Sequence, residues 1–168
     1  MTTAQTIAID FDDEMKNTRK LLERVPMDDA HRDYKPHEKS MPLGILATHV
    51  AGLPSWPKMA LESQLFELQP DFKPRTATSA EELLEMFDRS VEEGRAAIDR
   101  ATEDDIQKTW TFKYRDFSST SDRTKVIRSF INHLVHHRAQ LGVYLRLNGI
   151  PIPGMYGPSA DDAWPGGN

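Results

Sequence analysis

The spacing of apolar residues predicts four long helices. In four stretches, apolar residues recur every three or four positions, as on a helix that buries one face and leaves the other in water. The stretches cover residues 7–25, 40–52, 80–100 and 121–148. At the third, Ser79 and Glu82 have the spacing of a capping box, which marks a helix start. Four such helices bury their apolar faces most simply as a four-helix bundle, so the predicted fold class is all-α.

Individual residues predict where the second helix begins and ends. Ser40 is the expected N-cap, with Pro42 tolerated in the first turn. Two prolines follow Gly52 closely and should break the helix there. Residues 59–68 are then expected to form a separate helical piece.

One segment before the last helix has a different period. From residue 109 to 115, the aromatic residues Trp110, Phe112 and Tyr114 alternate with polar ones, which is typical of a half-buried strand. No second run of this kind offers itself as a partner, and a lone strand does not make a sheet. We therefore expect a short aromatic strand or loop that covers one end of the bundle.

Length and composition fit one helical domain. The chain has 168 residues, of which 38% are hydrophobic and 28% charged, a balance suited to helices that each bury a single stripe. We expect a single domain over residues 1–168. Residues 150–168 are rich in Gly, Pro and Asp and are expected to form an extended C-terminal tail.

Charge and residue usage exclude several classes of function. The formal charge is −5, and Lys and Arg are dispersed rather than gathered in a patch, which argues against nucleic-acid binding. No stretch approaches the roughly 20 apolar residues that span a bilayer, and no leader-like segment starts the chain, so the expected location is the cytoplasm. Without cysteine, a metal would rest on His, Asp, Glu or water, and any thiol would come from a substrate.

Three histidines fall on helix faces that point inward. His133 and His137 are four residues apart, so they share one face of the last helix and could hold one metal ion. His49 lies near the middle of the apolar face of the second helix. His136 falls off the apolar stripe. The alternative is a hydrogen-bonded polar cluster in the core, which would bind no metal.

Other candidates near such a site have simpler explanations. The remaining histidines are expected elsewhere: His31 exposed, and His37 in a loop-packing or capping role. Trp56 and Tyr144 lie on the ligand faces and would be either pocket walls or plain core. Asp10, Asp13 and Glu14 could orient the imidazoles but are expected mainly as a solvated acidic turn. Arg138 and Arg146 could contact an anionic substrate but are expected mainly in surface ion pairs.

Several motifs together resemble one family. They are Tyr34–Ser40 leading into Leu46-Ala47-Thr48-His49, then His133–Leu141, Tyr144–Gly149 and Tyr156–Ser159. In this order they resemble the DinB-like superfamily, although Ala139 stands where a glycine is common. The resemblance implies a four-helix bundle with an up-down-down-up arrangement. It also implies a divalent metal held by His49, His133 and His137.

The resemblance also suggests reactions. Relatives include metal-dependent transferases that join low-molecular-weight thiols, such as bacillithiol or mycothiol, to electrophiles. Three imidazoles leave open positions on Zn²⁺ or Ni²⁺, where a thiol or a water could be activated. The sequence therefore predicts a metal-dependent enzyme that acts on a small-molecule substrate by thiol transfer or, as the alternative, hydrolysis. A non-catalytic metal-binding stress-response protein is the third interpretation, and a homodimer is left open.

Overall fold

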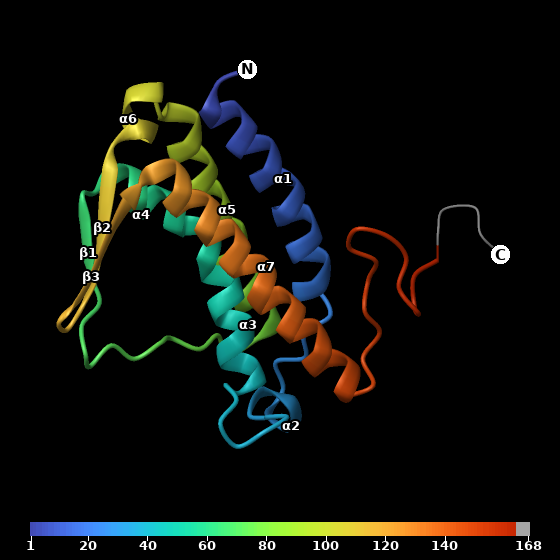
Figure 1. Ribbon diagram of the computed structural model, residues 1–168. Helices are drawn as coiled ribbons and strands as arrows, with labels where there is room; N and C mark the ends of the chain where they lie inside the picture. The colour runs from blue at the N-terminus through green and yellow to red at the C-terminus, as the bar shows by residue number, and fades with distance from the viewer. Residues whose placement is uncertain (164–168) are drawn as a thin grey trace.

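Four long helices pack side by side in the computed structural model, which describes residues 1–163 (Figure 1). They are α1 (Thr3–Leu22), α3 (Leu43–Gly52), α5 (Ala80–Arg100) and α7 (Arg123–Leu147). Both α1 and α3 contact both α5 and α7, and the buried apolar residues of all four form one core. Short helices α2 (Asp29–Arg32) and α6 (Glu103–Gln107) complete the connections. The prediction of a helix-rich fold is confirmed.

Local capping explains where the helices begin. The Ser79 hydroxyl accepts a hydrogen bond from the Glu82 amide at 3.1 Å, and α5 starts at Ala80 as predicted. The Glu82 carboxylate accepts from the Thr78 amide and hydroxyl at 2.7 Å each. Helix α1 begins earlier than predicted because Thr2 and Gln5 form a capping box ahead of it.

The second helix starts later than predicted and is followed by different elements. Pro42, rather than Ser40, is the N-cap of α3, because a proline disfavours helical backbone in the residue before it. After Gly52 the chain forms a 3₁₀ turn, η1 (Leu53–Ser55), and then α4 (Trp56–Glu62). The predicted helical piece over residues 59–68 is therefore wrong: the helix starts and ends earlier, and a strand follows it.

A three-stranded sheet replaces the lone strand expected from the sequence. Its strands are β1 (Leu65–Glu67), β2 (Thr109–Tyr114) and β3 (Phe117–Asp122), in the order β1-β2-β3. Leu65 pairs with Thr111 in a parallel ladder, and Thr120 pairs with Thr111 in an antiparallel one. The expectation that β2 has no partner is wrong. Its partner β3 is a polar, mostly exposed strand, and the absence of a hydrophobic alternation in β3 explains why the sequence did not predict it.

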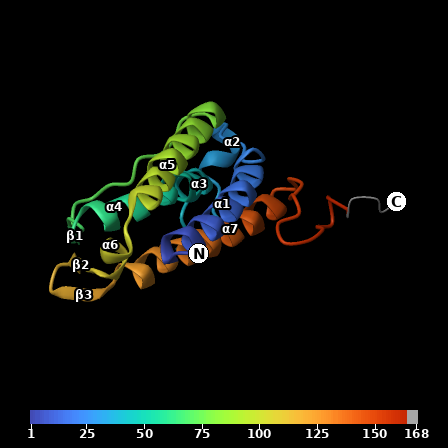
Figure 2. The same cartoon turned by 90° about the horizontal axis from the view of Figure 1, so that it is seen from above.

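The sheet and the C-terminal tail lie at opposite ends of the molecule (Figures 1 and 2). Residues 150–163 form no helix or strand, and residues 164–168 of the predicted tail lie outside the described part. Asp161 pairs with Arg146 of α7 and accepts a hydrogen bond from the Ile152 amide at 2.9 Å. These contacts dock the described part of the tail on the end of α7. No helix within residues 1–163 is long and apolar enough to cross a membrane.

A glycine lets α5 approach η1 closely. Gly94 of α5 faces η1, and a Cβ at this position would lie 1.9 Å from the carbonyl oxygen of Pro54. The same atom would lie 3.3 Å from the ring of Phe11. Only glycine therefore fits where α5 crosses the break between α3 and α4.

Candidate metal centre

Three histidine side chains converge between α3 and α7. Each of His49, His133 and His137 offers one ligand nitrogen, and these atoms all lie within 4.8 Å of one another. The Nε2 atoms of His49 and His133 are 3.1 Å apart. Within residues 1–163, no Asp or Glu side chain completes this group as a fourth member. The cluster is compatible with one metal ion held by three imidazoles.

The helices bring these rings together in a simple way. His133 and His137 are one turn apart on α7, and their ring centroids are 4.4 Å apart. His49 comes from α3, the helix packed against that face, with its ring 4.7 Å from that of His137 and 5.3 Å from that of His133. The structure thus brings together the three histidines that the sequence singled out.

The surroundings of the cluster keep its imidazoles neutral. All three side chains are half-buried. Burial, followed by the nearby His137 and His133, lowers the pKa of His49 to about 4. Burial is also the main cause that lowers the pKa of His133 and that of His137. At neutral pH each ring therefore keeps a free lone pair, which is the form that binds a metal.

The other histidines lie outside the cluster. The ring of His136 is 5.0 Å from that of His137, on the exposed side of α7. His37 is exposed, and its Nδ1 accepts from the Lys39 amide at 3.1 Å, as its predicted capping role requires. His31 is half-buried rather than exposed, and its Nδ1 pairs with Asp28 at 2.8 Å.

Aromatic packing borders the cluster on one side. Trp56 stacks on His133 with ring centroids 5.4 Å apart and planes 21° apart, and it meets His49 edge-on at 5.8 Å. Tyr144 is buried in the core, and its hydroxyl donates to the Met41 carbonyl at 3.2 Å. Of the two aromatic residues considered from the sequence, Trp56 therefore walls the site and Tyr144 does not.

The acidic residues of α1 do not orient the histidines. Asp10 is exposed, and Asp13 pairs with Lys16 at 3.2 Å. Glu14 instead forms an ion pair with Arg138. These three residues are therefore surface or structural groups.

A glutamine that the sequence reasoning missed contacts one ligand. Oε1 of Gln140 lies 2.8 Å from Nδ1 of His137. The two residues are three positions apart on α7, a spacing at which helix side chains meet, so the sequence carried a signal for this contact.

Arg138 and Arg146 of α7, both singled out from the sequence, have different partners. Arg138 is 3% exposed and donates to the Glu14 carbonyl and the Thr18 hydroxyl, both at 3.0 Å. Surface pairing was the wrong expectation for Arg138, because it lies on the side of α7 that faces α1. The same expectation is right for Arg146, which pairs with Asp161.

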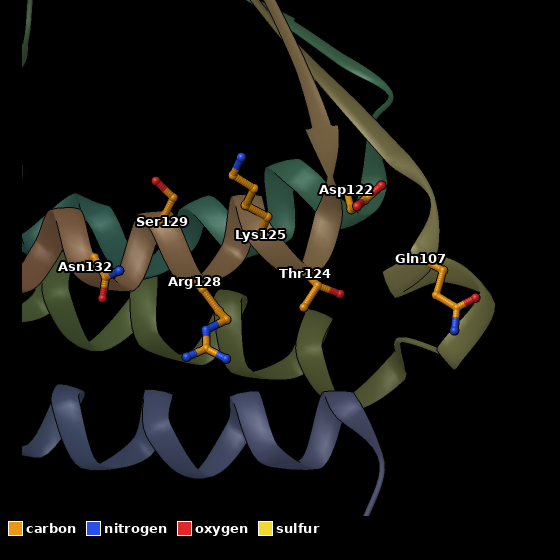
Figure 3. Close-up of a pocket in the computed structure, with 7 residues that line it drawn as sticks. All are labelled: Gln107, Asp122, Thr124, Lys125, Arg128, Ser129 and Asn132. Carbon is orange, nitrogen blue, oxygen red and sulfur yellow. The ribbon is translucent and has the colours of Figure 1, made fainter.

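A separate polar groove lies along the first turns of α7. Figure 3 shows Lys125 and Ser129 on one side of this helix and Arg128 on the other. The groove has a volume of about 710 Å³ and is lined by Gln107, Asp122, Thr124, Lys125, Arg128, Ser129 and Asn132. The three clustered histidines are not part of its lining, so it is distinct from the candidate metal centre.

Comparison with known proteins identifies the family. The sequence pattern of the DinB family matches residues 1–165, and the chain therefore belongs to the DinB family. The resemblance seen in the motifs is confirmed. A search of curated proteins found no match.

Solved structures show the same fold. A DinB-like protein from Bacillus cereus ATCC 10987 superposes with a TM-score of 0.72 at 20% identity, covering 90% of this chain and 97% of that one. A DinB-like protein from Bacillus subtilis superposes with a TM-score of 0.65 at 21% identity, covering 87% of this chain and 95% of that one. At these identities the likeness concerns the fold.

Proposed function

We propose that this protein is a divalent-metal-dependent enzyme whose ligands are His49, His133 and His137. In this proposal, α1, α3, α5 and α7 are the four helices of a DinB-like bundle, and the three ligands lie between α3 and α7. The observation that carries it is the convergence of three ligand nitrogens within 4.8 Å of one another. Bundle interiors are common places for such ligand sets, because facing helices aim side chains at one point.

The donor set favours a site open to a substrate. Structural zinc sites are usually closed by four protein ligands, whereas catalytic ones keep three and leave a position free. Here three imidazoles converge, and each is partly exposed. A bound Zn²⁺ or Ni²⁺ would supply a Lewis acid that lowers the pKa of a coordinated thiol or water.

The chain's own residues would hold this centre and limit its access. Trp56 covers His133 and meets His49, so water is excluded from that side of the rings. The lowered pKa values keep all three donors unprotonated near neutral pH. We propose a low-molecular-weight thiol as the substrate and its transfer to an electrophile as the reaction, by analogy with the thiol transferases among the DinB-like proteins. Because the chain itself has no cysteine, the substrate would supply the sulfur.

Metal content tests the proposal directly. The protein is purified without a metal-affinity column or chelator, and its metal is measured by mass spectrometry for the wild type and His137→Ala. We expect about one equivalent in the wild type and its loss in the variant. No metal in either protein, even after incubation with Zn²⁺ and Ni²⁺, would contradict the proposal and favour a polar core cluster.

Turnover then separates the reactions. The metal-loaded protein is assayed with a small thiol plus an electrophile, and with activated esters for hydrolysis. Turnover of the ester alone would replace thiol transfer by hydrolysis. A protein that holds metal but turns over neither substrate set would favour the non-catalytic interpretation.

A further inference from the structure

One polar contact reaches the cluster from outside it. The side-chain carbonyl of Gln140 lies 2.8 Å from Nδ1 of His137. A glutamine carbonyl oxygen can only accept a hydrogen bond, so Nδ1 of a neutral His137 must carry the proton. The other ring nitrogen, Nε2, then has a free lone pair.

The other two rings of the cluster already present the same atom. The Nε2 atoms of His49 and His133 face each other at 3.1 Å. A neutral imidazole can carry its proton on either nitrogen, and the hydrogen bond made by one nitrogen decides which is free to bind a metal. The Gln140 contact selects the tautomer in which His137 also presents Nε2.

The two ligands from α7 are held by different means. His133 is stacked on Trp56 at 5.4 Å, so aromatic packing fixes the plane of its ring. His137 is half-buried, and the Gln140 acceptor lies on the exposed side of its ring. The hydrogen bond that Nδ1 donates to this acceptor both fixes the tautomer and restrains rotation of the ring.

We propose that Gln140 is a positioning residue that orients His137 and holds its Nε2 ready for the metal. This inference rests on the proposed function, because it assigns a role at the same site. Hydrogen-bond partners of metal-bound histidines typically change metal affinity by about 10- to 100-fold when they are removed. We expect an effect of this size here.

Three variants of the full chain separate positioning from a structural role. Gln140→Met keeps length and helix propensity but removes the acceptor, whereas Gln140→Glu keeps an acceptor. Asn132→Met places the same side chain at another exposed position of α7 and is the matched control. Zn²⁺ affinity is measured by competition with a chromophoric chelator. The His137 tautomer is read from long-range ¹H–¹⁵N spectra of the metal-free protein.

The expected result is specific to the acceptor. Gln140→Met should weaken Zn²⁺ binding about 10- to 100-fold and lose the Nδ1–H form of His137 as the dominant tautomer. Gln140→Glu should restore both, and Asn132→Met should match the wild type. The inference is overturned if Gln140→Met binds Zn²⁺ as the wild type does while His137→Ala does not, a result that leaves the proposed function intact. A wild type that binds no Zn²⁺ overturns both.

Discussion

Arg138 forms a buried ion pair with Glu14, and this pair fixes the last helix against the first. Nη2 of Arg138 lies 2.6 Å from the Glu14 carboxylate, and the two side chains are 3% and 18% exposed. The hydroxyl of Tyr156, from the C-terminal tail, donates to the same carboxylate at 2.8 Å. Because Arg138 directly follows His137, the ion pair sets the rotation of α7 that turns the ligand histidines toward α3.

Removing the Glu14 carboxylate should destabilise the folded protein. Glu14→Ala leaves the Arg138 charge buried without its partner, and breaking one side of a buried pair costs about 3 kcal/mol or more. We expect urea denaturation to show a loss of this size in the free energy of unfolding. Asp13→Ala is the control, since Asp13 is exposed and pairs with Lys16 on the surface, and its effect should stay within about 0.5 kcal/mol. Equal losses of unfolding free energy in the two variants would show that the Arg138–Glu14 pair adds nothing to stability.

Metal retention should distinguish the neighbouring histidines of α7. His136→Ala is expected to keep the metal, because its ring lies on the exposed side of the helix, outside the three-nitrogen group. His137→Ala is expected to lose it. The measurement is the number of Zn²⁺ equivalents after dialysis. The opposite outcome, with metal kept in His137→Ala and lost in His136→Ala, would overturn the ligand assignment.

Two glycine positions should respond oppositely to alanine. Gly94→Ala would force a methyl group against the Pro54 carbonyl, and overpacking of this kind costs about 2 kcal/mol. Gly142 lies in α7, where an added Cβ meets no atom of residues 1–163 within 4 Å, so Gly142→Ala should stabilise the protein by up to about 1 kcal/mol. Thermal unfolding of both variants checks this. An unchanged thermal stability of Gly94→Ala would show that η1 shifts to make room for the methyl group.

The docking of the tail should depend on pH through Asp161. Hydrogen bonding from Arg146, followed by that from the Ile152 amide, lowers the pKa of the Asp161 carboxyl. A lowered pKa means that the docked tail favours the carboxylate. Its stabilising effect is therefore fully present above the ordinary pKa of about 3.9 and is lost as pH falls through the lowered value.

The Ile152 amide reports this transition. Its NMR chemical shift should titrate with a midpoint below about 3.9. Asp161→Asn should abolish the transition and make the tail easier to cleave by protease at neutral pH. A midpoint at the ordinary carboxyl value would show that the two hydrogen bonds do not hold the tail in solution.

The long helices were predictable because apolar residues recur every three to four positions along each of them. Ser79 marked the start of α5 correctly, since an N-cap acts within its own turn. Ser40 failed as a cap because Pro42 constrains the residue before it. The sheet was missed because β3 carries three serines and one threonine on an exposed edge, where burial imposes no alternation.

The candidate site was predictable in its ligands and not in its surroundings. A spacing of four residues places His133 and His137 on one face whatever the rest of the chain does. Burial of Arg138, by contrast, depends on Glu14 and Tyr156, which reach it from opposite ends of the chain. Such partners follow from tertiary packing, which a pattern along one helix does not record. The contact of Gln140 with His137 is local, and the same helix spacing predicts it.

The parallel ladder between β1 and β2 carries a consequence for the order of folding. Leu65 pairs with Thr111, and the whole of α5 and α6 lies between them in the chain. Closing so long a loop costs conformational entropy before the ladder returns any stabilisation. The β2–β3 hairpin has a two-residue turn and can form early. The strand β1 should therefore join the sheet late, after α5 has docked, and be among the first elements to exchange its amide hydrogens in the native state.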